Sequence, residues 1–287
     1  MSDRQILYLI DGTAQAYRAY FAFIKRPLIN SKGEETSAPY GFTAALFKLL
    51  REYQPDLLAC VFDTAAPTFR HKQFADYKAT REKMPEEMVG QLPRIDQIVE
   101  ALEIPILRLE GFEADDVIGT LAKQGEEAGL DVVMVSGDKD FMQLVTDHVT
   151  MLAPARTSDD WKVVDRQGVV EKFGVPPEQV TQVLGLMGDT SDNIPGVPKV
   201  GPKTATTLIQ QYGTFEAVLE NAADVKGKVV SENLIEFADQ ARLSLDSARS
   251  RQVRSEHTSA GAACSMCGEF CAMALVEDYL GVSATKC

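Results

Sequence analysis

The chain has no hydrophobic run long enough to cross a membrane, and it contains little histidine or tryptophan. The first apolar run, residues 6–10, has five residues, whereas a membrane-spanning helix needs about 20. We therefore expect no signal peptide, no membrane anchor and a cytoplasmic location. The only three histidines, His71, His148 and His257, have no partner pattern typical of covalent catalysis.

Positive charge is also scarce, since the formal net charge is −13 over 287 residues. Taken alone, this deficit argues against a nucleic-acid partner, because phosphate binding requires a positive surface. The argument weakens if the acidic residues crowd one site, where bound divalent cations would reverse the local sign. The hydrophobic fraction of 45% is sufficient for a large core, which we expect to form one large and one smaller domain.

Three apolar segments end close to an aspartate. Residues 6–10 precede Asp11, residues 57–62 precede Asp63, and residues 132–135 are followed by Ser136, Gly137 and Asp138. Helical patterns such as residues 41–53 lie between these segments, which indicates an α/β fold with a mostly parallel central sheet and helices on both faces. The carboxyl ends of the strands would then gather the three aspartates at one edge, where ligands bind in such sheets.

Further carboxylates are expected at the same edge. The apolar spacing after Glu113 predicts a helix that begins near Ala114, which places Asp115 and Asp116 in its first turn. A helix dipole explains one such acid but not three in four positions. With Asp138 and Asp140, these five carboxylates would repel one another unless cations compensate their charge, and we therefore expect a divalent metal site.

A basic segment with aromatic residues interrupts the α/β pattern between residues 68 and 100. Tyr77, Lys78 and Arg81 would lie near one another on a helix, given their spacing. The segment is expected to form a clamp whose cations hold phosphates and whose aromatic side chains stack on unpaired bases. A solvated helical insertion with incidental charge is the alternative. The cationic side chains are Arg70, His71, Lys72, Lys78, Arg81 and Lys83.

Residues 188–205 combine an acidic turn with a glycine-flanked hairpin. Asp189 and Asp192 lie in the turn, and Pro202 suits the first position of a helix that Gly213 would end. The pattern predicts a helix-hairpin-helix motif whose backbone N–H groups and helix N-terminus bind a phosphate. The residues expected to do so are Gly196, Val197, Lys199, Gly201, Lys203 and Thr204.

Together these motifs resemble the 5′-3′ exonuclease domain of bacterial DNA polymerase I, which is related to the flap endonucleases and has a PIN-like fold. The resemblance runs in order from residue 6 to about residue 245. Its motifs are Leu9-Ile10-Asp11-Gly12, Val61-Phe62-Asp63, Phe69-Arg70-His71, Tyr77-Lys78-Ala79-Thr80-Arg81, the acidic motifs at 111–116 and 136–140, and the loop and hairpin at 188–205.

The resemblance implies a two-metal phosphodiesterase that acts on DNA with 5′ flaps, 5′ ends or nicks. Two Mg²⁺ ions about 4 Å apart, for which Mn²⁺ can substitute, would activate water and neutralise the leaving oxygen. Lys78 and Arg81 would act on the scissile phosphate at the base of a helical arch, and a K⁺ ion would bind at the hairpin. Arg70, Lys72 and Tyr77 would contact DNA. The implied metal ligands are Asp11, Asp63, Glu113, Asp115, Asp116, Asp138, Asp140, Asp189 and Asp192.

The implied domains are a catalytic domain at residues 1–172 with its arch at about 70–100, and a helical lobe at residues 173–245. A monomer is expected, with a separate DNA polymerase as a partner. One alternative is a catalytically inactive module that binds DNA junctions. A small-molecule phosphatase would need neither the basic segment nor the hairpin. The sequence leaves open the balance of exo- and endonucleolytic cutting and the cleavage of RNA primers.

Residues 246–287 depart from the family pattern and form an atypical tail. Cys264, Cys267 and Cys271 have a spacing suited to zinc or an iron-sulfur cluster, with Cys287 or His257 as a further ligand. This segment resembles the cysteine segment of phosphomethylpyrimidine synthase over barely twenty residues. A fused or displaced gene end and a disordered tail are the alternatives. Cys60, in an apolar strand, is expected to be a small core residue.

Overall fold

The computed structural model describes residues 4–155 and 160–249, so the predicted tail ligands lie outside the described residues. The described residues divide into two compact units. Unit 1 holds residues 4–66 and 84–137, and unit 2 holds residues 67–83 and 138–249 without the gap at 156–159. None of the described helices is long and apolar enough to span a membrane.

Unit 1 is built on four parallel strands that pair in the order β3-β2-β1-β4. In the central strand, Ile10 lies opposite Cys60 on one side and Val135 on the other. The strands are apolar along their length because both faces of a parallel sheet are covered; Cys60 is fully buried, as predicted. They are β1 (Ile6–Asp11), β2 (Leu57–Val61), β3 (Ile106–Leu107) and β4 (Asp131–Val135).

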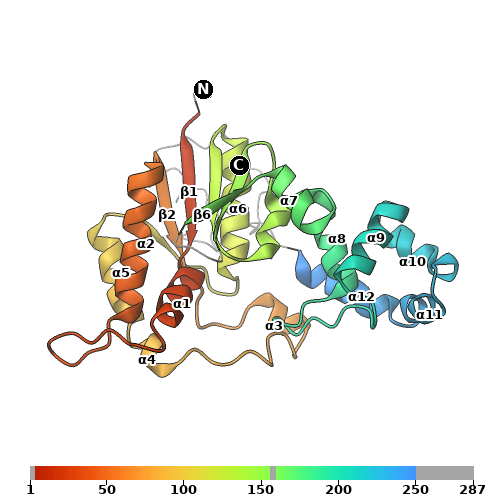
Figure 1. Ribbon diagram of the computed structural model, residues 1–287, viewed down its shortest axis with the longest axis horizontal. Helices are drawn as coiled ribbons and strands as arrows, with labels where there is room; N and C mark the ends of the chain where they lie inside the picture. Colours follow the sequence, from red (N-terminus) through yellow and green to blue (C-terminus); the bar gives the residue numbers. More distant parts are fainter. Residues whose placement is uncertain (1–3, 156–159, 250–287) are drawn as a thin grey trace, which may run out of the picture. The chain divides into compact units, whose positions relative to one another are not determined.

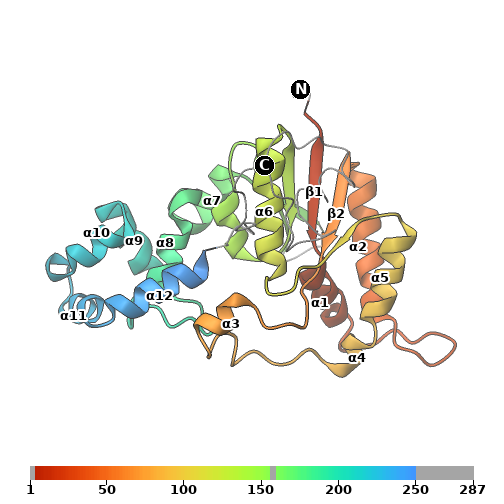
Figure 2. The same cartoon turned by 180° about the vertical axis from the view of Figure 1, so that it is seen from behind.

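Helices cover both faces of this sheet, as the sequence predicts. The chain advances from β1 through β2 to β3 and then returns through α6 to β4, on the other side of β1. Right-handed crossovers therefore place α6 on the face opposite α2, as the two views of Figures 1 and 2 show. The reversal beside β1 creates a topological switch point at the carboxyl ends of β1 and β4, which is where ligands generally bind in open α/β sheets. The helices are α1 (Gly12–Ala22), α2 (Ser37–Tyr53), α4 (Glu86–Val89), α5 (Leu92–Ala101) and α6 (Ala114–Glu127).

Unit 2 combines a short antiparallel pair of strands with a mainly helical lobe, drawn in green and blue in Figure 1. The central helix is α8, which packs against α9 and α12 and buries Val180, Val183 and Leu184. The elements are α3 (Phe69–Gln73), the 3₁₀ helix η1 (Lys139–Leu144), β5 (Val149–Pro154), β6 (Trp161–Val164), α7 (Arg166–Phe173), α8 (Pro177–Met187), α9 (Pro202–Tyr212), α10 (Phe215–Glu220), η2 (Ala222–Asp224), α11 (Lys228–Glu236) and α12 (Ala238–Ala248).

The predicted helix through Tyr77 and Arg81 is wrong. Lys78 adopts a left-handed backbone conformation with φ of 55°, which a continuous α-helix does not accommodate. Instead, the N–H groups of Tyr77, Ala79 and Arg81 each donate to the carbonyl three residues earlier, which makes a series of turns. Between residues 70 and 100 the helices are α3, α4 and α5, and α5, with Ile95 and Val99 fully buried, belongs to the core of unit 1.

Candidate metal and nucleic-acid site

Asp11 ends β1 at the switch point, where its carboxylate is held on both oxygens. Oδ1 accepts a hydrogen bond of 2.9 Å from the N–H of Ala14 and so caps α1, and Oδ2 accepts one of 2.8 Å from the hydroxyl of Ser136 at the end of β4. The residue is only 4% exposed. These donors hold the carboxylate in a fixed orientation although it is buried.

Four more carboxylates of unit 1 lie at the N-terminus of α6. Glu113 and Asp116 form a reciprocal capping box, in which the Asp116 side chain accepts from the Glu113 N–H at 3.2 Å. Asp63 accepts from the Ala114 N–H at 2.8 Å. The positive end of the helix thus offsets part of the repulsion among these groups. Asp115 lies in the first turn of the same helix, as predicted.

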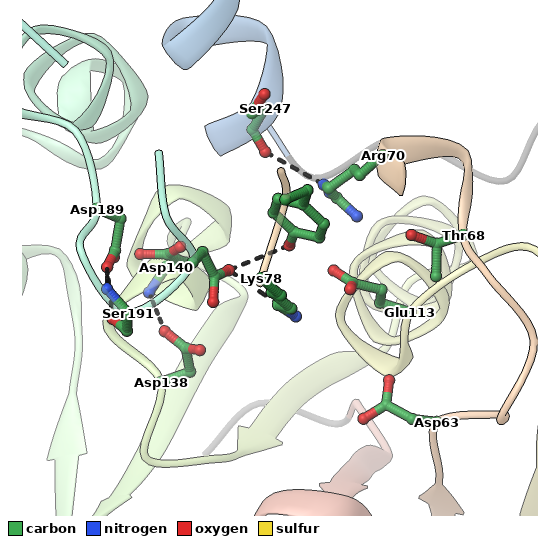
Figure 3. A network of polar contacts seen from close by, with 12 residues as sticks. Asp63, Thr68, Arg70, Lys78, Glu113, Asp138, Asp140, Asp189, Ser191 and Ser247 are labelled. Carbon is green, nitrogen blue, oxygen red and sulfur yellow. Dashed lines mark hydrogen bonds and ion pairs between the residues drawn. The ribbon is translucent and has the colours of Figure 1, made fainter. Parts of the chain in front are cut away.

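Unit 2 carries a second acidic group, which consists of Asp138, Asp140, Asp189 and Asp192. Figure 3 labels the first three of these residues. Asp138 is exposed and its Oδ1 accepts from the N–H of Asp140 at 2.9 Å. Lys139 makes an ion pair of 2.6 Å with Asp189. The other oxygen of Asp189 accepts from both the hydroxyl and the N–H of Ser191.

The charge balance of this group is uneven. Burial would raise the pKa of Asp189, but hydrogen bonds from Lys139 and Ser191 outweigh it and hold that pKa below its ordinary value. Burial, together with the negative charge of Asp138, raises the pKa of Asp140 to about 8, although Lys139 opposes this. Oδ1 of Asp140 is shielded from solvent and has no hydrogen-bond partner among the described residues.

The residues present fit a divalent cation. A buried carboxylate oxygen beside other carboxylates is stabilised either by a proton or by a cation, and the donors of both acidic groups are hard oxygen ligands, which suit Mg²⁺ with water completing the coordination shell. Within the described residues, no three His, Cys, Asp or Glu side chains already form a metal-ligand set.

The part of the basic segment that belongs to unit 2, residues 68–83, places its predicted DNA-contacting residues in two different environments. Lys72 and Arg81 are exposed. Arg70 and Tyr77 are only 6% and 4% exposed, and they contact other parts of unit 2. The Arg70 guanidinium donates to backbone carbonyls near the end of α12, and the Tyr77 hydroxyl donates to Oδ2 of Asp192 at 3.1 Å.

The hairpin between α8 and α9 has the predicted form. Gly188 and Gly196, which lie before and within the hairpin, approach each other so closely that neither leaves room for a side chain. A Cβ on Gly196 would lie 2.4 Å from the Gly188 nitrogen. α12 holds the same glycine, because the Gly196 N–H donates to Ser244 at 3.2 Å and the Gly196 carbonyl accepts from Gln240 at 2.6 Å.

The exposed part of the hairpin leads into α9. Val197 is buried, whereas Lys199, Gly201 and Lys203 are exposed. Gly201 is the N-cap residue and brings no side chain to the first N–H groups of the helix. Those groups can therefore donate to an anion, and the two lysines add positive charge.

Several residues of the site carried no recognisable signal in the sequence. Ser136, Ser191 and Ser244 are common polar residues whose partners become apparent only when distant loops meet. Gln143 is a similar case, since its amide donates both to the Asp140 carbonyl at 2.8 Å and to the Ala248 carbonyl at 3.0 Å. Lys139 could have been predicted from the sequence as a residue of the site, because it lies between the predicted metal ligands Asp138 and Asp140.

Solved structures with the same fold are nucleases. A T5 5′-exonuclease with divalent metal ions (zinc) bound superposes with a TM-score of 0.70 at 22% identity, over 85% of this chain and 89% of that one. The catalytic core of Rad2 in complex with DNA substrate superposes with a TM-score of 0.55 at 14% identity, over 97% of this chain and 89% of that one. At these identities the likeness shows the fold, which is that of the 5′ nucleases.

Sequence comparison is more specific. Residues 6–174 match the model of the 5′-3′ exonuclease N-terminal resolvase-like domain, and residues 175–253 match that of the 5′-3′ exonuclease C-terminal SAM fold. The chain belongs to the 5′-3′ exonuclease family. It is 45% identical to DNA polymerase I of Bacillus subtilis (strain 168) over 85% of its length, and 43% identical to DNA polymerase I of Treponema pallidum (strain Nichols) over 79%. It spans 28% and 23% of those relatives.

Proposed function

We propose that this chain is a divalent-metal-dependent 5′-3′ exonuclease and flap endonuclease that hydrolyses DNA phosphodiester bonds near 5′ ends. The chain belongs to the 5′-3′ exonuclease family, and the structural observation that supports the proposal is the environment of the Asp140 carboxylate. Its shielded oxygen and raised pKa, beside Asp138 and Asp189, describe a carboxylate whose negative charge Lys139 balances only in part. A divalent cation supplies the remaining positive charge.

The proposed metal ligands are the nine carboxylates, five in unit 1 and four in unit 2. They would hold two Mg²⁺ ions, whose chemistry when bound would be to lower the pKa of a coordinated water and to offset charge on the leaving oxygen. The capping and hydroxyl contacts described above hold the carboxylates in place before the metal binds. The ligands are Asp11, Asp63, Glu113, Asp115, Asp116, Asp138, Asp140, Asp189 and Asp192.

The cationic residues of unit 2 bind the substrate in this proposal. Lys78 and Arg81 hold the scissile phosphate and stabilise the charge that develops on it. Lys199, Lys203 and the N-terminus of α9 hold the phosphates of the duplex, with K⁺ at the hairpin. A DNA polymerase is the proposed partner, and the expected cytoplasmic location and monomeric state stay predictions, as does the division of the chain at residues 172 and 245.

Cleavage of a 5′-labelled flap duplex tests the proposal, with Mg²⁺ and with EDTA. The protein should cut near the junction only with metal, and Asp140→Asn should lower the single-turnover rate by at least about 10- to 100-fold. Asp165→Asn is the control, because Asp165 is an aspartate of unit 2 that caps the N-terminus of α7 by accepting the Gly168 N–H and lies outside the site. Tight binding without cutting by the unmodified protein would instead favour a junction-binding module.

A further inference from the structure

Four contacts join the turn at residues 76–78 to the acidic loop at residues 189–194, more than a hundred residues later. The Lys78 N–H donates to the Asp192 carbonyl at 3.0 Å. The Tyr77 hydroxyl and the Lys78 ammonium both contact Oδ2 of Asp192, at 3.1 and 3.8 Å. The Asn193 side-chain amide donates to the Asp76 carbonyl at 2.6 Å.

The backbone on both sides of this junction is held in an unfavourable conformation. Lys78 and Asn193 have φ values of 55° and 57°, in the left-handed region. Few non-glycine residues occupy that region, asparagine more readily than lysine, and surrounding contacts help to maintain it. The four contacts provide such a restraint, and they act on the residue whose ammonium is proposed to meet the scissile phosphate.

The acidic loop is itself well anchored. Asp189 and Ile194 exchange two backbone hydrogen bonds of 2.8 and 2.7 Å that close the loop. Lys139 and Ser191 fix the Asp189 side chain. A turn that is fastened to this loop is therefore fastened to a rigid support within unit 2.

We propose that Asn193 and the Tyr77 hydroxyl are positioning residues that fix the Lys78 ammonium by fastening its turn to the acidic loop. The proposal rests on the function proposed above for Lys78. Asp192 then has two tasks: it holds the turn through its carbonyl and carboxylate, and it belongs to the acidic group. The position of the lysine and the geometry of that group are thereby coupled.

Two variants each remove one contact with little other change. Tyr77→Phe deletes only the hydroxyl, and Asn193→Gly deletes the amide while glycine tolerates the positive φ. Tyr212→Phe and Asn221→Ala are the matched controls, since Tyr212 lies at the end of α9 and the amide of Asn221, the residue that follows α10, donates to the Ala217 carbonyl of that helix.

The first readout does not depend on nuclease activity. Acylation of lysines in EDTA without DNA, followed by mass spectrometry, should modify Lys78 several-fold faster in both test variants, whereas exposed Lys72 and Lys203 should react at unchanged rates. An unchanged Lys78 rate in both variants would overturn the proposal.

The second readout separates positioning from folding. The single-turnover cleavage rate should fall about 10- to 100-fold in each variant while substrate affinity changes less than about twofold. Equal losses in rate and affinity together with a lowered melting temperature would overturn the positioning role. If the unmodified protein does not cut, the proposed function fails, and the acylation pattern still decides whether these contacts hold Lys78.

Discussion

The Nε of Arg70 donates a hydrogen bond of 3.2 Å to the carbonyl oxygen of Ser247, 177 residues further along the chain. A second nitrogen of the same guanidinium donates to the Arg249 carbonyl at 3.1 Å. The carbonyls at the end of a helix have no partners within the helix, and a buried cation satisfies them well. Arg70 thereby joins the basic segment to the last turn of α12.

This contact predicts where the chain can be shortened. A version that ends at Ser244 loses both carbonyls and also Leu245, whose side chain packs on Gly185. We expect it to be less stable by at least about 3 kcal/mol than the full chain and than a version that ends at Arg249, both of which keep these contacts. Urea unfolding of the three proteins measures the difference, and equal midpoints would contradict the assigned role of α12.

Two glycines of the hairpin should respond differently to alanine. Gly196→Ala meets the backbone of Gly188 and a positive φ, so we expect a loss of more than about 2 kcal/mol of stability. Gly201→Ala meets no atom within 4 Å and, at an N-cap position, should cost less than about 1 kcal/mol of stability. Gly201→Ala should nevertheless weaken duplex binding several-fold if a phosphate approaches the N-terminus of α9, because the added methyl group would lie in its way. Thermal unfolding and DNA titration of both variants check this, and a stable Gly196→Ala protein would refute it.

The raised pKa of Asp140 predicts a pH dependence of stability in EDTA. Since that pKa is about 8 in the folded state and 3.8 ordinarily, the folded state binds the proton more tightly than the unfolded state does. Stability without metal should therefore decrease as the pH rises from about 4 to 8.

Mg²⁺ should restore much of the stability lost at pH 8, and Asp140→Asn should flatten the pH dependence in EDTA. Melting temperatures at several pH values, with and without Mg²⁺, test both statements. Asp165→Asn serves again as the control and should retain the full pH slope. A melting temperature of the unmodified protein that increases over this range would oppose the assignment.

The hydroxyl of Ser136 should matter for both folding and metal binding. Ser136→Ala removes the donor to the buried Asp11 carboxylate, which we expect to cost about 1.5–3 kcal/mol of stability and to weaken Mg²⁺ binding about 10-fold. Ser247→Ala, whose hydroxyl donates only within α12, should change neither quantity appreciably. Chemical unfolding and calorimetric metal titration provide the comparison; equal effects of the two substitutions would argue against a special role for Ser136.

The sequence by itself determined the α/β class, the family and the order of the main elements. Buried parallel strands are continuous apolar runs, so β1, β2 and β4 were recognisable, to within a residue, from the apolar residues 6–10, 57–62 and 132–135 alone. The first turn of α6 was predictable too, because helix starts have local signals at Glu113 and Asp116. Spacing failed for Tyr77 and Arg81, where a left-handed residue follows from a distant contact with Asp192 rather than from local preference.

Only the tertiary structure decided what the polar side chains contact. Arg70 has the positive charge expected of a DNA-binding residue, but in the folded chain its guanidinium donates to carbonyls at the end of α12. Asn193, Ser136 and Gln143 acquire their partners in the same way, through hydrogen bonds between segments 100 or more residues apart. Helical and strand periodicity records which face of an element is buried, whereas such long-range bonds depend on how loops meet in three dimensions, which no local pattern encodes.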